Sequence, residues 1–319
     1  MGSILPANRA NIERAADLLI RGHLVAFPTE TVYGLGAVAT RREAVQRLFE
    51  AKGRPPDHPV IVHLARAGEI DEWCSQVPAA ARALADAFMP GPLTLVLPRA
   101  PHVSTALTGG QETIGLRVPS HPVAAELLSL VGGGVAAPSA NRFGHVSPTA
   151  ARHVEDDLGD CVDAILDGGP SNVGLESTIV DLSGERPRLL RPGVVTEADL
   201  CQVLGHPPLP SGGSAPRVPG TLERHYAPST PARLVSTARL ESGELGPGRY
   251  GVLARTSELQ GFRGDWCVMP KGPSGYGRQL YARLREFDRK GLSAILIEEV
   301  PEAPEWRAIR DRLVRATRR

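Results

Sequence analysis

The chain has 319 residues, of which 42% are hydrophobic and 22% are charged, and its formal charge is +1. These ordinary globular values argue against intrinsic disorder. At roughly 150 residues per domain, the length predicts about two domains, each able to bury a core without disulfide or metal staples. No apolar run approaches the roughly 20 residues of a membrane span, so we expect a soluble, cytoplasmic protein with no membrane partner.

The first two thirds of the chain predict a mixture of helices and short buried strands. Apolar residues at helical spacing predict helices at residues 9–20, 41–51, 79–88 and 122–131. Short apolar runs predict strands at residues 24–27, 60–64, 93–97, 114–118, 135–137, 164–166, 178–181 and 188–190. Several of these strands follow one another without room for a helix. We therefore expect an α/β fold whose sheet is not purely parallel.

A stretch rich in proline and glycine divides the chain. Residues 205–231 read GHPPLPSGGSAPRVPGTLERHYAPSTP, which cannot continue helices or central strands. Beyond it, predicted strands at 233–235, 250–254 and 294–297 alternate with predicted helices at 277–290 and 304–318, as in a small Rossmann-like α/β unit. We predict a first domain over residues 1–205, a linker over 206–230 that crosses the active site, and a second domain over 231–319.

Charge is distributed unevenly along the chain. Residues 1–210 carry 17 basic and 23 acidic side chains, a net −6, and residues 211–319 carry 19 and 12, a net +7. Opposite charges favour contact between two domains, over a range that screening limits to about 8 Å at physiological salt. The negative first part argues against generic RNA binding there, because neutralising phosphates requires a net basic surface.

Several common catalytic motifs do not occur in the sequence. There is no GxxxxGK[ST] phosphate loop, no GxSxG nucleophile elbow and no HExxH zinc motif. Gly34 and Gly36 lack the third glycine of a dinucleotide fingerprint, and a lone GxG usually marks a tight turn. Covalent catalysis and zinc chemistry therefore have little support.

Polar clusters instead stand next to predicted strands, where α/β proteins present their binding residues. The clusters are PTETVYGLG (28–36), KGRPPDHPVIVHL (52–64), TIGLRVP (113–119), APSANRFGHVSPT (137–149), GLESTIVDL (174–182) and LLRPG (189–193). Thr29, Glu30 and Thr31 have a simpler interpretation as caps of a following helix. Serines and threonines in such clusters also commonly serve turns.

Two of the clusters predict anion sites. Lys52 and Arg54 flank one glycine in a chain whose other lysines are Lys271 and Lys290, and a point charge beside a planar fork suits a polyphosphate. The alternative is a solvated surface loop. Arg117 lies within an otherwise apolar strand, and a buried arginine requires an anion, either a ligand or a structural carboxylate.

In this order and spacing, the clusters resemble the YrdC-like domain of the L-threonylcarbamoyladenylate synthase family over about residues 8–205. Lys52 with Arg54 matches the family's KxR signature, and Ser139 with Asn141 matches its SxN signature. RHYAP at 224–228 and the domain after it resemble the two-domain branch. The resemblance implies a twisted mixed sheet with helices around a large concave cavity, followed by a small Rossmann-like C-terminal domain.

The resemblance also implies a nucleotidyltransferase that condenses L-threonine, bicarbonate or CO₂, and ATP into threonylcarbamoyl-AMP and pyrophosphate. A separate threonylcarbamoyl transferase complex would then use this product to modify adenosine 37 of tRNAs that read ANN codons. Mg²⁺ is expected to accompany ATP, held by phosphates and water, since the sequence offers no dedicated cage of carboxylates.

Residue roles follow from the same resemblance. Threonine contacts are implied for Thr31, His63, Arg117, the backbone at Ala137, and Ser177. ATP contacts are implied for Lys52, Arg54, His58, Thr113, Ser139, Asn141, Ser147, Arg191 and, reaching back from the linker, Tyr226. Lys52 and Arg54 would be the catalytic cations. His63 can act as a general base or as a neutral donor to a carboxylate, and we favour the donor.

Two other functions compete with this one. A YrdC-like module of the hydrogenase maturation type is disfavoured, because this chain has neither acylphosphatase nor zinc-finger segments. A double-stranded RNA-binding YrdC-like protein is the other alternative. The basic final helix leaves a contact with tRNA or an acidic partner open, although the same face can instead dock on the acidic first domain; its arginines are Arg307, Arg310, Arg312, Arg315, Arg318 and Arg319.

Overall fold

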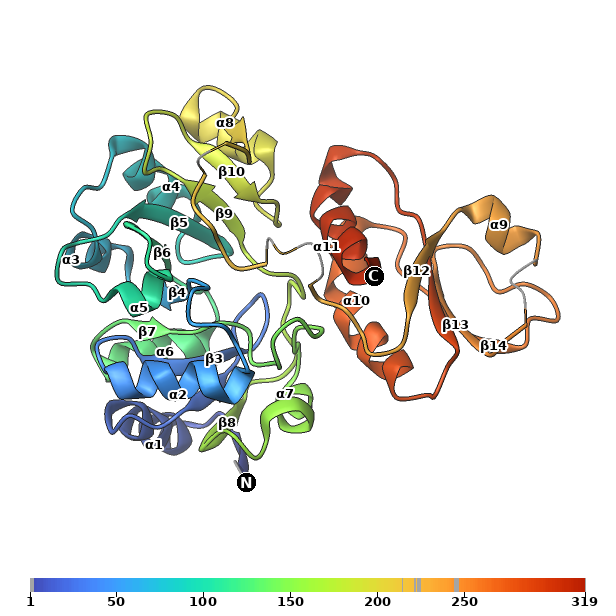
Figure 1. Cartoon of the computed structure of the whole chain (residues 1–319), viewed down its shortest axis with the longest axis horizontal. Helices are drawn as coiled ribbons and strands as arrows, with labels where there is room; N and C mark the ends of the chain where they lie inside the picture. The colour runs from blue at the N-terminus through green and yellow to red at the C-terminus, as the bar shows by residue number, and fades with distance from the viewer. Residues whose placement is uncertain (1–2, 214, 221, 223–224, 244–246, 319) are drawn as a thin grey trace.

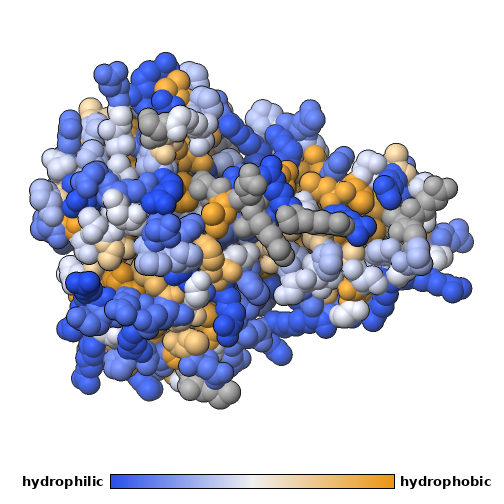
Figure 2. Space-filling view, viewed as in Figure 1, coloured by the Kyte–Doolittle hydropathy of each residue, from blue (hydrophilic) through white to orange (hydrophobic). Residues whose placement is uncertain are grey.

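The structure is a computed structural model that describes residues 3–213, 215–220, 222, 225–243 and 247–318. Figure 1 shows two lobes, the first with strands β1 to β11 and the second with strands β12 to β15. Hydrophilic side chains cover most of the face of the molecule shown in Figure 2. None of the helices within these ranges is long and apolar enough to cross a membrane.

Within the described residues, the first lobe holds an 11-stranded sheet in the order β1-β8-β2-β3-β7-β4-β6-β5-β9-β10-β11. Its strands are β1 Ser3–Pro6, β2 Val25–Phe27, β3 Gly34–Val38, β4 Ile61–His63, β5 Leu93–Pro98, β6 Thr113–Arg117, β7 Val135–Ala136, β8 Ala164–Asp167, β9 Thr178–Asp181, β10 Arg188–Arg191 and β11 Leu209–Pro210. Parallel pairs such as β4 with β6 occur beside antiparallel pairs such as β5 with β6. The expected mixed sheet is confirmed.

Amphipathic helices pack on this sheet. They are α1 Arg9–Ile20, α2 Arg42–Lys52, α3 Ile70–Trp73, α4 Ala79–Phe88, α5 Thr105–Thr108, α6 Pro122–Val131, α7 Ala151–Leu158 and α8 Glu197–Leu204, with a 3₁₀ turn η1 at Ala67–Glu69. In α1 the buried residues Ile12, Ala15, Ala16 and Leu19 repeat at helical spacing. Asn8 caps this helix by accepting a hydrogen bond from the backbone of Asn11.

The second lobe is a smaller α/β unit. Its strands β12 Ala232–Val235, β13 Tyr250–Ala254, β14 Gly264–Val268 and β15 Ala294–Glu298 lie in the order β12-β15-β13-β14, and each adjacent pair is parallel. Its helices are α9 Thr237–Glu241, α10 Pro273–Asp288 and α11 Arg307–Thr317, with a 3₁₀ turn η2 at Pro304–Trp306. In Figure 1, α10 and α11 face the first lobe, whereas α9 and β14 lie at the far end.

The structure corrects the capping interpretation of Thr29, Glu30 and Thr31. The strand β3 follows them, not a helix, and Thr29 accepts hydrogen bonds from the backbone of Thr31 and Val32 in a tight turn. Glycines hid this strand from the hydrophobic pattern. A Cβ at Gly36 would lie 2.9 Å from the ring of Phe27, so the packing of β3 requires glycine there.

The interface between the lobes joins arginines of the second domain to acidic residues of the first. Arg312 pairs with Glu176 at 2.7 Å, and Arg285 pairs with Asp157 at 2.6 Å. Two further pairs join Arg289 to Asp156 and Arg307 to Glu197. The basic face of α11 thus docks, through Arg307 and Arg312, on the acidic first domain.

We expect the buried pair to contribute far more to stability than an exposed one. The Arg312→Met substitution leaves the carboxylate of Glu176 buried without its cation and should lower the free energy of unfolding by about 3–5 kcal/mol. Arg307→Met removes an exposed pair and should cost at most about 1 kcal/mol. Urea unfolding of the full chain measures both, and equal losses would contradict this assignment.

Candidate functional site

Backbone hydrogen bonds bring polar segments from distant parts of the chain together. Tyr33 donates to the carbonyl of Pro148 at 2.9 Å and accepts from the backbone of Ala140 at 2.8 Å. Gly174 donates to the carbonyl of Thr31 at 3.1 Å. The clusters at 28–36, 137–149 and 174–182 therefore form one contiguous region of the first lobe.

Lys52 connects two of the predicted signatures. It is the last residue of α2, and Gly53, with a φ of 61°, ends the helix in the left-handed region that favours glycine. The buried Nζ of Lys52 donates to the carbonyl of Ser139 at 2.5 Å and to that of Asn141. Burial, followed by the charge of Arg54, lowers the pKa of Lys52 well below its ordinary value.

Arg54 lies just beyond the same helix. Its Nη2 donates to the carbonyl of Pro59 at 2.6 Å, and its guanidinium lies 5.4 Å from the ring centroid of Phe143. Burial lowers the pKa of Arg54 to about 10. The ring of His58 also contacts Phe143, with the two ring centroids 5.2 Å apart. Burial, followed by the charge of Arg54, lowers the pKa of His58.

Arg191, at the end of β10, holds Ser177. Its Nε and Nη2 donate to the carbonyl of Ser177 at 3.0 and 2.9 Å, and Nη2 also lies 3.1 Å from the Oγ of Ser177. That hydroxyl is 2.7 Å from the hydroxyl of Thr94 on β5. Burial lowers the pKa of Arg191.

Lys52, Arg54 and Arg191 are buried, and among the described residues none of them pairs with a carboxylate within 4.0 Å. Burial lowers the pKa of the nearby His225 to about 3. The charges of all three cations lower the pKa of His225 further, whereas the charge of Glu176 raises it. Buried cations without a carboxylate form a candidate binding site for an anionic ligand.

Arg117 differs, because the structure gives it a protein carboxylate. Its Nη2 donates to the Oε1 of Glu30 at 2.6 Å, and the backbone of Ser120 donates to Oε2. The parallel register of β4 and β6 places His63 beside Arg117. Burial, followed by the charge of Arg117, lowers the pKa of His63 to about 3, and its Nδ1 is buried without a hydrogen-bond partner in the described part of the chain.

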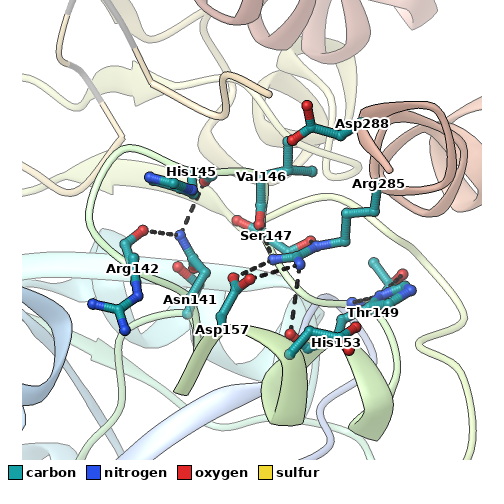
Figure 3. A network of polar contacts seen from close by, with 12 residues as sticks. Asn141, Arg142, His145, Val146, Ser147, Thr149, His153, Asp157, Arg285 and Asp288 are labelled. Carbon is teal, nitrogen blue, oxygen red and sulfur yellow. Dashed lines mark hydrogen bonds and ion pairs between the residues drawn. The ribbon is translucent and has the colours of Figure 1, made fainter. Parts of the chain in front are cut away.

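The other predicted residues lie around these groups. The Oγ1 of Thr31 is 2.9 Å from that of Thr29, and the backbone of Ala137 donates to the carbonyl of Ile61 at 3.0 Å. Asn141 donates to the carbonyls of Arg142 and His145, as Figure 3 shows. Ser139 is half-buried beside β3, where its backbone forms an isolated antiparallel β-bridge with Gly34.

The structure places Ser147 and Tyr226 at the junction with the second domain. Ser147 donates to the Oε1 of Glu176 at 2.6 Å. The ring of Tyr226 stacks on that of Tyr281 with centroids 5.8 Å apart, and the guanidinium of Arg312 lies 5.2 Å from its centroid. Tyr226 has a φ of 58°, a strained conformation for a non-glycine residue.

The linker lies over one part of the site. Its first residues form β11, an edge strand that pairs with β10, and Arg217 exchanges hydrogen bonds with the side chain of Gln111. Val218 packs on Ile61, Val96, Ile179 and Leu190. A cavity of about 10 Å³ remains beneath it, lined in part by Thr94 and by the half-buried Thr113. This space is too small to hold an ATP molecule.

A larger cavity of about 840 Å³ lies elsewhere on the first lobe, lined by residues that include Arg42, Trp73 and His102. It contains none of the predicted site residues. We place the functional site at the polar clusters because the desolvated cations lie there. Buried groups with shifted pKa values indicate a functional site more strongly than the size of a surface cavity does.

Sequence reasoning missed Glu176 and assigned Glu30 to a cap. Both acids stand in segments that are otherwise apolar or hydroxyl-bearing, which is the signal that identified Arg117. It also missed Thr94, which nothing distinguishes from an ordinary strand threonine. His225 was unremarkable in sequence, because its burial depends on contacts with distant residues, among them the ring of Phe143 and the backbone of Arg315.

The mixed sheet with converging polar strand ends, followed by a small parallel α/β domain, defines a two-domain YrdC-like protein. Residues 17–193 match the Sua5/YciO/YrdC family, described as "Telomere recombination", and residues 195–317 match "Threonylcarbamoyl-AMP synthase, C-terminal domain". The chain belongs to the two-domain threonylcarbamoyl-AMP synthase family.

Relatives match nearly the whole chain. Threonylcarbamoyl-AMP synthase of Bacillus subtilis is 38% identical over 98% of this chain and 94% of its own length. That of Pyrococcus abyssi is 38% identical over 96% and 94%. The crystal structure of P. abyssi Sua5 complexed with L-threonine superposes with a TM-score of 0.92 at 36% identity and covers 99% of this chain and 97% of its own.

The pKa values of the buried histidines predict a loss of stability in acid. The folded chain keeps His225 neutral down to about pH 3, whereas the unfolded chain takes up a proton near pH 6.5. The free energy of unfolding should therefore fall as the pH decreases from 6.5 toward 3, by about 1.4 kcal/mol per pH unit for this residue. Urea unfolding between pH 6 and 4.5 should show a shallower slope in His225→Phe, which keeps an aromatic ring. An unchanged slope would contradict the burial of a neutral imidazole.

Proposed function

We propose that the chain condenses L-threonine, bicarbonate or CO₂, and ATP into threonylcarbamoyl-AMP and pyrophosphate. The observation that carries this proposal is the group of buried cations Lys52, Arg54 and Arg191, none of which pairs with a carboxylate in the described part of the chain. A triphosphate is an anion of matching charge, and arginine forks and a lysine point charge are its usual protein ligands.

In this proposal Lys52 and Arg54 bind the phosphates. Lys52 uses two of its three N–H donors on carbonyls, which leaves the third for a phosphate oxygen. Because these cations are already desolvated, little reorganisation is needed as charge develops on the leaving pyrophosphate. His58, Thr113, Ser139, Asn141, Ser147 and Tyr226 complete the ATP contacts in this proposal.

Threonine is proposed to bind near Arg117 and Glu30. The carboxylate of threonine would lie against the guanidinium of Arg117. The Nη2 of this guanidinium donates a hydrogen bond to Glu30, which fixes its orientation. Thr31 and Ser177 would fix the amine and hydroxyl, with the backbone of Ala137 beside them. With a pKa of about 3, His63 is a poor base near neutral pH, which favours its role as a neutral donor to the carboxylate.

The chemistry requires no enzyme nucleophile. The amine of threonine attacks CO₂, forms a C–N bond and loses a proton to give a carbamate. A carbamate oxygen then attacks the α-phosphorus of ATP while the bond to the departing pyrophosphate breaks. Positioning and charge stabilisation supply most of the catalysis in adenylyl transfer of this kind. The linker over the site would shield the mixed anhydride from water.

We propose that Mg²⁺ arrives with ATP and is held by its phosphates and water. Among the described residues no group of three or more His, Cys, Asp or Glu side chains is arranged to hold a metal ion. When bound, the ion would neutralise phosphate charge beside the cations of the protein.

The proposed product is a reactive anhydride, so another enzyme must consume it. We propose that a threonylcarbamoyl transferase complex uses it to modify adenosine 37 of tRNAs that read ANN codons, in the cytoplasm. Because Arg307 and Arg312 are engaged by the first domain, α11 offers less free positive charge for direct tRNA contact than its sequence suggested.

Pyrophosphate release tests the proposal directly. With ATP and bicarbonate, threonine should give the strongest signal among the amino acids. The kcat/KM for serine, which lacks one methyl group, should be about 10- to 200-fold lower than that for threonine. The kcat/KM for valine, which leaves the hydroxyl contacts unpaired, should be lower still. Mass spectrometry should detect threonylcarbamoyl-AMP in the threonine reaction. Pyrophosphate release that is independent of the amino acid would reject this function.

A further inference from the structure

The loop at residues 137–149 has to be held in shape from outside, because it is largely irregular and carries several of the proposed ATP contacts. Lys52 holds its first part through the carbonyls of Ser139 and Asn141. Asn141 ties the middle together by donating to the carbonyls of Arg142 and His145. The last part of the loop, at Val146 and Ser147, has a different support.

Besides Glu176, which accepts a hydrogen bond from the hydroxyl of Ser147, that support is Arg285 of the second domain. It extends from α10 across the domain junction, and Figure 3 shows its guanidinium between the loop and α7. Nη2 donates to the carbonyl of Val146, and Nε donates to the carbonyl of Ser147 at 3.4 Å. Arg285 is only 8% exposed, so water does not compete strongly for these carbonyls.

Asp157 fixes the orientation of the guanidinium. Its Oδ1 lies 3.1 Å from Nη1 of Arg285, and its Oδ2 lies 2.6 Å from Nη2, which is the two-point geometry of a carboxylate on an arginine fork. Nη1 also donates to the carbonyl of His153 at 3.5 Å. The guanidinium is therefore held on the α7 side and presents its remaining donors to the loop.

We propose that Arg285 is a positioning residue for ATP, through which the second domain supports catalysis without touching the reacting atoms. The inference rests on the proposed function, which assigns Ser139, Asn141 and Ser147 to the nucleotide. Arg285 contacts the last part of the loop that carries these residues, whereas the proposed threonine contact Ala137 lies at the other end of the loop, where its backbone donates to Ile61. The proposed threonine contacts Arg117 and His63 lie on β6 and β4, and neither makes a hydrogen bond with Arg285 in the described part of the chain. Loss of Arg285 should therefore weaken ATP use selectively.

Arg289 supplies a matched control. It caps the C-terminus of α10, one turn beyond Arg285, and pairs with Asp156, the neighbour of Asp157, so it joins the same two helices. It is exposed and makes no hydrogen bond to the loop within the described residues. If Arg285 merely fastened the domains together, Arg285→Met would raise the KM for ATP and the KM for threonine alike, and Arg289→Met would do the same to a smaller extent, as expected of an exposed pair.

The experiment measures the KM for ATP and for threonine in the full chain. Arg285→Met should raise the KM for ATP about tenfold or more, as expected for a displaced binding loop, and change the KM for threonine less than about twofold. Arg289→Met should leave both within about twofold. Adding Ser147→Ala to Arg285→Met should raise the KM for ATP less than Ser147→Ala does alone, because both act through the same loop.

Equal changes in the two KM values, or an unchanged KM for ATP in Arg285→Met, would overturn the inference. Should Arg285→Met fail to fold, Arg285→Lys takes its place, because it keeps the charge beside Asp157 and loses the fork, and the same selective rise is required of it. A wild-type chain without threonine-dependent pyrophosphate release would refute the proposed function itself. An active wild type with unaltered ATP use in the variants would refute only the role of Arg285.

Discussion

The burial of Lys52, Arg54 and Arg191 without carboxylate partners in the described part of the chain is the constraint on which the account depends. Protein carbonyls replace part of their lost hydration, as in the bonds from Lys52 to Ser139 and Asn141. Carbonyl dipoles do not balance a full charge, and burial lowers the pKa of each cation. Burying these cations costs free energy in the unliganded protein, and a bound polyanion would offset that cost by balancing their charge.

The remaining buried arginines show that the fold can supply carboxylates where it needs them. Glu30 pairs with Arg117, and Glu176 pairs with Arg312. These pairs hold strand ends and domains in place, whereas the unpaired cations face the polar clusters. The second domain belongs to the same scheme, because its net positive charge is placed against the negative first domain at the helices α10 and α11.

Much of the fold was predictable because it follows local patterns. The predicted helix at 9–20 and strand at 178–181 coincide with α1 and β9, while α10 begins at Pro273, earlier than predicted, since Gly275 and Gly277 weaken its helical pattern. The strand β3 was missed because its glycines fit beside Phe27 and carry no hydrophobic signal. A strand whose composition is set by close packing cannot be recognised from periodicity.

The candidate site was predictable in its residue types more than in its contacts. An arginine within an apolar strand indicated that Arg117 needs an anion, but only the fold shows that Glu30 provides one. Two partners of Glu176, Tyr281 and Arg312, lie more than one hundred positions away in the chain, and a third, Ser147, lies in a different loop. Such pairings depend on how the domains dock, and no local pattern encodes them.

The comparison of ATP with adenosine in a calorimetric titration of the full chain tests the central claim most directly. If the desolvated cations bind the phosphates, ATP should bind at least about 100-fold more tightly than adenosine, since each charge-assisted hydrogen bond contributes roughly 1.5–3 kcal/mol. Equal affinities for the two ligands would show that the buried cations do not hold the triphosphate, and the account would fail.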